Sequence, residues 1–164
     1  MKIGVIGTGN WGGNLVRNLA ALEVLAGVAD PVEENRAKSL EDAPGIEVFE
    51  DAGALISAGY DAVGIATPAA THFAIAKQAL EAGLDVFVEK PMTLDPQEAR
   101  DLHILALAND RILMVGHLQL YQPAITFVAD YLKAGKLGEV YTMHQRRSKL
   151  GRVRDKENVM WSFG

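Results

Sequence analysis

The stretch that decides the fold is KIGVIGTGNWG, residues 2–12. Its apolar first half is typical of a buried parallel strand, and the apolar periodicity of residues 15–22 predicts a helix directly after it. Between the two stands the pattern Gly7-x-Gly9-x-x-Gly12. In this pattern Gly7 permits a tight turn, Gly9 lets the backbone approach a pyrophosphate, and Gly12 lets the helix pack closely on the strand. The helix N-terminus adds free N–H donors and the positive end of the helix dipole.

This order of strand, loop and helix predicts a dinucleotide site. A GxGxxG pattern alone is a weak signal, because glycine-rich turns are common, but its place between a strand and a helix makes it strong. The predicted loop contacts are Gly7, Thr8, Gly9, Asn10, Trp11 and Gly12. Trp11 is unusual in such a loop, and it either walls the cofactor or packs on a later segment.

An acidic residue follows the second apolar run, residues 24–29. Asp30 lies 18 residues after Gly12, close to the roughly 20-residue offset at which a carboxylate binds the ribose hydroxyls. A carboxylate there repels a 2′-phosphate, and no arginine follows immediately to accept one, so the sequence favours NAD over NADP. The alternative reading of Asp30 is a helix cap before Pro31.

The rest of the chain up to residue 116 alternates between strand and helix patterns. Near-continuous apolar strands of this kind indicate a parallel sheet covered on both faces, so we expect an α/β fold, a Rossmann-type doubly wound sheet. The expected strands are 24–29, 46–49, 61–66, 84–88 and 112–116, and the expected helices are 32–42, 52–58, 71–82 and 95–109.

The pattern changes after residue 116. Pro123 is expected to start a helix, and residues 137–147 read as a longer strand, followed by a basic run, 146–154, and an apolar tail, 159–164. The basic run reads as a solvated loop rather than a phosphate contact. We expect a cofactor domain over 1–120 and the incomplete start of a substrate and oligomerisation domain over 121–164. Strand 137–147 and the tail could then mediate self-association.

Composition excludes several classes of protein. The net charge of −5 disfavours nucleic acid as a partner, because cationic contacts dominate that binding. The absence of cysteine excludes disulfides and thiolate sites. No apolar run approaches the roughly 20 residues needed to cross a bilayer, and the first strand leaves no room for a signal peptide. We therefore expect a soluble, cytoplasmic protein.

Several candidate residues fall at the predicted carboxyl ends of strands, where open parallel sheets bind ligands. A nicotinamide enzyme that oxidises an alcohol needs a base for the hydroxyl proton. Lys90 is the best candidate, because a lysine partly desolvated near the positive nicotinamide would have a lowered pKa. The alternative is a solvated loop lysine. The cofactor contacts predicted from these strand ends are Thr67, Pro68, Glu89 and Lys90.

Two histidines accompany these strand ends. His117 follows the sixth strand and is a candidate for substrate contact and catalysis, although a lone histidine is more often structural. His72 stands in the first turn of its helix and either lines the cofactor pocket or is simply a helix residue. No set of His and carboxylate residues has metal-ligand spacing, so the sequence predicts no metal.

Taken together, these motifs resemble the Gfo/Idh/MocA oxidoreductase family. The resemblance rests on the glycine loop, Ala66-Thr67-Pro68 with His72, Glu89-Lys90-Pro91, and Gly116-His117 with Tyr121 and Pro123. Residues 9–18 and 158–162 look like the branch of 3-dehydrogenases acting on UDP-N-acetylglucosamine-type nucleotide sugars. The resemblance implies a Rossmann domain followed by a substrate domain, a catalytic Lys90, and a Lys90–Pro91 bond that is often cis.

The chain departs from this family in length. Family members run to about twice this size, and a second, histidine-containing catalytic motif would begin just after Gly164. The resemblance therefore implies the NAD-binding part of a dehydrogenase that oxidises a secondary hydroxyl of a sugar or nucleotide sugar, with little or no turnover by this chain alone. A different class, a non-catalytic module that responds to NAD, stays open as the alternative.

Overall fold

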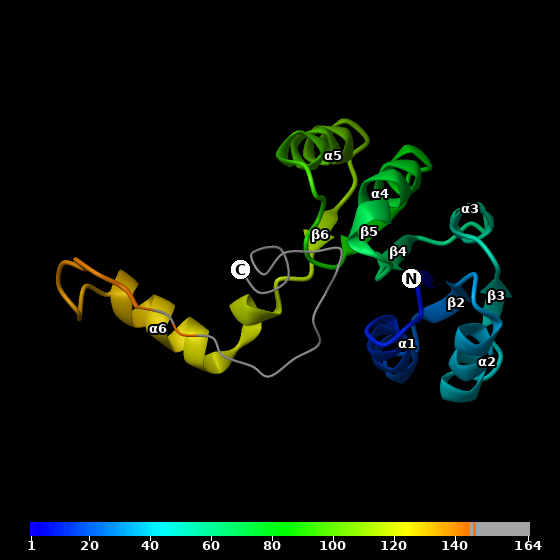
Figure 1. Ribbon diagram of the computed structural model, residues 1–164, viewed down its shortest axis with the longest axis horizontal. Helices are drawn as coiled ribbons and strands as arrows, with labels where there is room; N and C mark the ends of the chain where they lie inside the picture. The colour runs from blue at the N-terminus through cyan, green and yellow to red at the C-terminus, as the bar shows by residue number, and fades with distance from the viewer. Residues whose placement is uncertain (145, 147–164) are drawn as a thin grey trace. The chain divides into compact units, whose positions relative to one another are not determined.

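The computed structural model describes residues 1–144 and 146. The chain divides into two compact units, of which the first is Met1–Gly116 and the second begins at His117. The first unit, coloured blue to green in Figure 1, is an alternation of strands and helices. It contains the glycine loop, Asp30 and Lys90, so the unit is described first.

The described residues of the first unit form one parallel sheet in the order β3-β2-β1-β4-β5-β6. The strands are β1 (Ile3–Ile6), β2 (Leu25–Ala29), β3 (Glu47–Phe49), β4 (Ala62–Ile65), β5 (Asp85–Val88) and β6 (Leu113–Val115). The chain builds outward from β1 in both directions, so the strand order reverses between β1 and β4. This is the Rossmann arrangement that the sequence predicts, and it sets a ligand crevice at the carboxyl ends of these strands.

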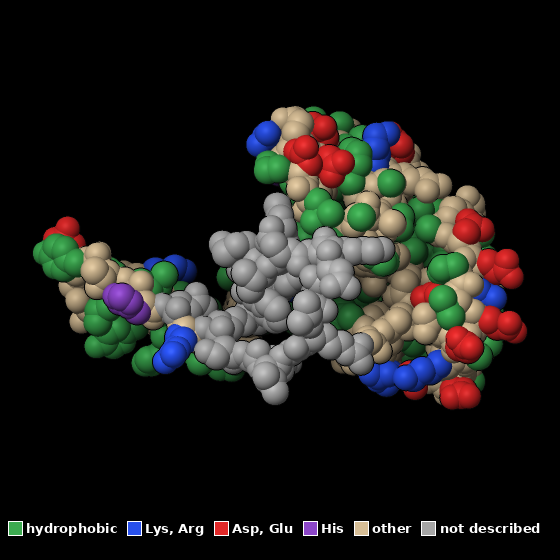
Figure 2. Space-filling model, in the orientation of Figure 1, with side chains coloured by type: hydrophobic (Ala, Val, Ile, Leu, Met, Phe, Trp, Pro, Cys, Tyr) green, Lys and Arg blue, Asp and Glu red, His purple; other side chains and the backbone are tan. Residues whose placement is uncertain are grey.

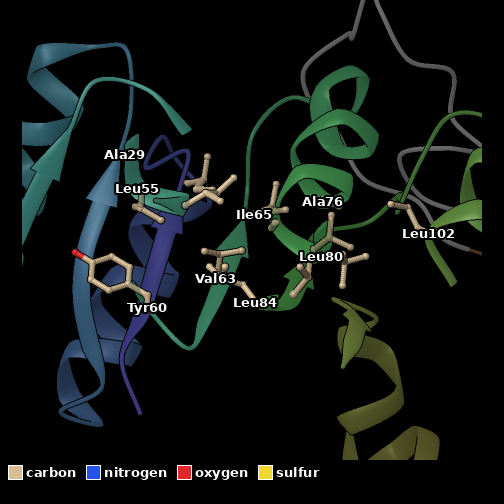
Figure 3. Close-up of a cluster of buried hydrophobic side chains, with 14 of the residues drawn as sticks. Ala29, Leu55, Tyr60, Val63, Ile65, Ala76, Leu80, Leu84 and Leu102 are labelled. Atoms are coloured by element: carbon tan, nitrogen blue, oxygen red, sulfur yellow. The ribbon is translucent and has the colours of Figure 1, made fainter. Parts of the chain in front are cut away.

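Helices cover both faces of this sheet. They are α1 (Gly12–Ala21), α2 (Glu33–Asp42), α3 (Ala52–Ile56), η1 (Ala69–Thr71), α4 (His72–Glu81) and α5 (Pro96–Ala108). Val5 and Val28 pack with Val16 of α1 on one face. The other face carries the larger core, where strand residues such as Ile65 meet Leu80 of α4 (Figure 3). Alternate residues of each strand thus face opposite layers.

Tyr60 fixes the end of the sheet away from the crevice. Its ring covers Gly4 and Gly27, where an added Cβ would lie 2.9 Å and 2.3 Å from Tyr60 atoms. Its hydroxyl donates to Glu47 Oε2 at 2.5 Å. Burial raises the pKa of Tyr60, and the hydrogen bond and negative charge of Glu47 raise it further. Tyr60 thus contacts the first half of β1, the middle of β2 and the first residue of β3, and it stabilises the sheet.

The second unit contains η2 (Leu118–Tyr121) and α6 (Pro123–Lys133) among its described residues. Helix α6 starts at Pro123, as the sequence predicts. The strand expected at 137–147 is wrong for its described part, because residues 137–144 contain no strand. Their alternation is real, but a strand also needs a neighbour to bond its backbone groups, and no pairing within the described residues includes them. Most of the basic run and all of the tail 159–164 lie outside the described residues.

The helices are short relative to a bilayer. Within residues 1–144 and 146, none is both long and apolar enough to span a membrane.

Candidate functional site

The glycine loop between β1 and α1 has the geometry of a phosphate cradle. Gly7 has a φ of +83°, and an added Cβ would lie 2.8 Å from the main-chain nitrogen of Thr67. At Gly12 an added Cβ would lie 1.8 Å from the Gly7 carbonyl oxygen, so the loop closes on itself. By contrast, an added Cβ at Gly9 meets nothing within 4 Å. Gly9 is therefore the open side of the loop, where a ligand can approach the backbone and the N-terminus of α1.

Asp30, at the end of β2, ties this loop to the β2–α2 turn. It is only 6% exposed. Its Oδ2 accepts the Thr8 N–H at 2.7 Å, and its Oδ1 accepts the Val32 N–H at 2.9 Å and an Asn35 side-chain N–H at 3.2 Å. Val32 is the N-cap of α2, so Asp30 supports the helix start without being its cap. We call Thr8, Asp30, Val32 and Asn35 the Asp30 corner.

A cavity of about 640 Å³ lies at the carboxyl ends of β1, β2 and β4. It falls within the usual range for small-molecule sites, ~300–1,000 Å³. Its walls combine the glycine loop, Asp30 and the β4 end, with residues that include Gly7, Gly9, Asp30, Thr67, Pro68 and Ile75. Trp11 is 44% exposed and does not belong to this lining. The open Gly9 and the carboxylate opposite it fit a dinucleotide, whose pyrophosphate and ribose need those two features.

The side of the first unit built by α2 and α3 is acidic, as the red side chains in Figure 2 show. Glu50 and Asp51 from this side also line the cavity. Negative charge here disfavours a ligand with an additional phosphate near the Asp30 corner.

Arg36 is a neighbour of the site that the sequence did not indicate. One turn into α2, its Nη1 donates to the Asp30 main-chain carbonyl at 2.7 Å, and its Nη2 lies 3.6 Å from Glu50 Oε1. The Arg36 guanidinium thus contacts the main chain of Asp30 and not its carboxylate. The sequence did carry a signal for this contact. Side chains one turn into a helix tilt back towards its N-terminus, and Asp30 stands just before α2.

The second cluster, which we call the Lys90 corner, comprises Thr67, His72, Glu89, Lys90 and Pro91 at the ends of β4 and β5. The Lys90–Pro91 bond is cis, as the resemblance implies. Lys90 is exposed, whereas the Glu89 side chain is only 7% exposed. Gly116 is required beside it, because a Cβ there would lie 2.8 Å from Glu89 Oε1.

The two carboxylate oxygens of Glu89 differ. Oε2 accepts the Lys90 N–H at a long 3.3 Å, and Oε1 is buried with no hydrogen-bond partner among the described residues. An unsatisfied buried acceptor costs ~1–3 kcal/mol. The Lys90 corner therefore retains a cost that the Asp30 corner does not.

The histidines take different places. His72 is 1% exposed and lies outside the cavity lining, with its ring between the main-chain carbonyls of Thr67 and Pro91. His117 is the exposed first residue of the second unit, directly before η2. Direct contact of either with cofactor or substrate stays a prediction. No three His, Asp or Glu side chains in the described part of the chain are grouped to hold a metal.

A family profile described as "Oxidoreductase family, NAD-binding Rossmann fold" matches residues 1–117. The chain belongs to the Gfo/Idh/MocA oxidoreductase family. The match confirms the family, the fold and the cofactor class, NAD, that the glycine loop and Asp30 predict.

Several of the similar proteins are named as dehydrogenases. The chain is 38% identical to UDP-N-acetylglucosamine 3-dehydrogenase of Acidithiobacillus ferrooxidans over 146 residues, 84% of this chain and 45% of that protein. It is 34% identical to the rhizopine catabolism protein MocA of Rhizobium meliloti, over 85% of this chain and 44% of the relative. The chain thus spans less than half the length of these relatives.

Solved structures agree on the fold. The Acidithiobacillus ferrooxidans enzyme superposes with a TM-score of 0.74 over 79% of this chain and 41% of that one, at 38% identity. The scyllo-inositol dehydrogenase of Lactobacillus casei, solved with NAD(H) and scyllo-inositol, gives a TM-score of 0.79 at 25% identity, over 85% of this chain and 42% of that one.

Proposed function

We propose that this chain supplies the NAD site and the catalytic Lys90 of a dehydrogenase that oxidises a secondary hydroxyl of a sugar or nucleotide sugar. One observation carries the proposal: the Thr8 N–H donates to Asp30 Oδ2 at 2.7 Å, which joins the glycine loop to a carboxylate that lines the same cavity. The named activities of the relatives, on UDP-N-acetylglucosamine and on inositol, support a substrate rich in hydroxyl groups.

The residues of the chain divide the binding of NAD between them. The open face of Gly9 and the first-turn N–H groups of α1 receive the pyrophosphate. Asp30 lines the cavity and accepts from a ribose hydroxyl in place of its long bond from Asn35, and the same charge repels a 2′-phosphate. When bound, NAD supplies the hydride acceptor.

Lys90 provides the proton transfer. In its neutral form the Nζ atom takes the proton from the substrate hydroxyl, so that the O–H bond breaks as the carbon loses its hydride. Lys90 is exposed at the end of β5, so a ligand bound over the sheet edge can approach its side chain. This chain alone is proposed to bind NAD and to turn over substrate poorly, because it spans less than half of the related enzymes.

Calorimetric titration of the folded chain with NAD and with NADP tests the proposal. We expect NAD to bind, with NADP at least about tenfold weaker, a difference of about 1.4 kcal/mol. Asp30→Asn should weaken NAD binding and reduce the preference for NAD over NADP. The control is Asp101→Asn, which changes an exposed carboxylate on α5 and should alter neither the affinity nor the preference. Binding of neither dinucleotide by the folded chain would overturn the proposal.

A further inference from the structure

His72 joins the ends of two strands through both of its ring nitrogens. It is the first residue of α4 and is 1% exposed. Nδ1 lies 2.7 Å from the Pro91 carbonyl oxygen, after β5, and Nε2 lies 2.9 Å from the Thr67 carbonyl oxygen, after β4. One buried ring therefore spans the Lys90 segment and a wall of the cavity.

The chemistry of these partners restricts the state of the ring. A carbonyl oxygen only accepts hydrogen bonds, and a neutral imidazole carries one N–H donor and one lone pair. A neutral ring would thus set a lone pair against a carbonyl oxygen at hydrogen-bond distance, inside the protein where His72 is 1% exposed. Only the imidazolium, with two N–H donors, satisfies both contacts, and both bonds are then charge-assisted.

Charged groups of both signs lie around the ring. On α4 itself, Lys77 pairs with Glu81. At the start of α5, Asp95 is engaged as the helix cap through the Gln97 N–H. On the β5 segment, the buried carboxylate of Glu89 lies two residues before Pro91, and the exposed amine of Lys90 lies one residue before it.

We propose that His72 is a positioning residue: a doubly protonated clamp that holds the Lys90–Pro91 segment to the cavity-facing end of β4. Its two donors act on main-chain carbonyls, so it sets where Lys90 stands without touching the reacting atoms. The clamp itself is a property of the folded chain, and only its value for catalysis rests on the proposed function.

The protonation state can be measured on the chain without any ligand. In a ¹⁵N-histidine-labelled sample, long-range proton–nitrogen spectra report each ring nitrogen. We expect both His72 nitrogens to show the shifts of protonated nitrogen at pH 7.5, and the exposed His103 on α5 serves as the reference ring in the same spectrum. An unprotonated nitrogen on His72 at this pH would overturn the proposal, whether or not the chain binds NAD.

Hydrogen exchange tests the clamping. Glutamine has no ring with a donor on each side, so His72→Gln should lose the bridge between the two carbonyls. The amides of Lys90, Met92 and Thr93 should then exchange at least about tenfold faster. Amides of the Asp30 corner should keep wild-type rates, and His103→Gln should change neither region. Unchanged exchange around Lys90 in folded His72→Gln would overturn the clamp. If that variant does not fold, the nitrogen spectra of the wild-type chain decide the question.

Discussion

The Asp30 corner and the Lys90 corner stand at the same sheet edge and each contains a buried carboxylate, but the two carboxylates differ in their hydrogen bonds. Both oxygens of Asp30 accept hydrogen bonds from the turn and the glycine loop. Glu89 has one long bond, and its Oε1 has no hydrogen-bond partner among the described residues. The first corner is therefore held by its own carboxylate, and the second by backbone carbonyls around His72.

This difference fits the proposed division of roles, in which the Asp30 corner binds the cofactor and the Lys90 corner carries out the proton transfer. A site that must hold a large cofactor gains from donors and acceptors that are already in place. A site that must move a proton needs a side chain such as Lys90 that is exposed to its ligand. Substitutions should therefore affect the fold and cofactor affinity at one corner, and turnover at the other.

The largest effect is expected at the glycine loop. Gly12→Ala places a Cβ 1.8 Å from the Gly7 carbonyl oxygen, backbone against backbone, so we expect a loss of about 3 kcal/mol or more in the free energy of unfolding. Urea denaturation followed by circular dichroism measures it.

Gly9→Ala is the matched control, because its Cβ meets nothing within 4 Å. We expect stability within about 1 kcal/mol of wild type but a clear loss of NAD affinity, since the methyl group occupies the approach of the pyrophosphate. If Gly9→Ala binds NAD like the wild type, the pyrophosphate does not lie on this loop.

Lys90→Ala should abolish most of the turnover and leave the affinity for NAD unchanged. We expect turnover, followed as NADH absorbance in a form of the protein that oxidises substrate, to fall about 100-fold or more, with NAD affinity close to wild type. Lys90→Arg should be as inactive, because a guanidinium is not deprotonated in proteins. Full activity in Lys90→Ala would favour the alternative of a non-catalytic module that responds to NAD.

Asp30→Ala should damage both fold and binding. It leaves the Thr8 and Val32 N–H groups without their acceptor, which costs about 2 kcal/mol or more. Thermal unfolding measures this cost, and a variant as stable as wild type would show that the corner does not depend on its carboxylate.

Glu89→Gln should stabilise the fold, whereas Asp30→Ala should destabilise it. Removing the charge from a buried oxygen that lacks a partner among the described residues should raise the free energy of unfolding by about 1 kcal/mol. A decrease comparable to that of Asp30→Ala would remove the contrast between the corners.

The smallest effect is expected away from both corners, at Tyr60. Its raised pKa means that folding favours the neutral phenol, so this contribution is fully present below the unfolded-state pKa of about 10 and falls as the pH rises above it. Tyr60→Phe should cost about 1 kcal/mol at neutral pH and flatten the alkaline loss of stability, as denaturation at pH 8 to 11 would show. An unchanged alkaline slope would contradict this assignment.

Sequence predicted whatever depends on local pattern. The glycine spacing, the apolar strands and the acid after β2 each report their structure within a short window, and the cis bond at Lys90 followed from a family resemblance. The contacts that sequence missed act across the fold. Arg36 reaches back to the Asp30 carbonyl, and His72, which the sequence offered as a pocket or helix residue, bridges carbonyls 5 and 19 residues away. The strand predicted over 137–147 is wrong in its described part, residues 137–144, for the same reason, since alternation does not supply a partner.

A crystal structure of the chain with bound NAD would show where the cofactor lies. We expect the pyrophosphate against Gly9 and the N-terminus of α1, a ribose hydroxyl within hydrogen-bond distance of Asp30, and the nicotinamide towards the Lys90 side of the sheet edge. A cofactor bound elsewhere, or one whose ribose makes no contact with Asp30, would contradict the proposed NAD site.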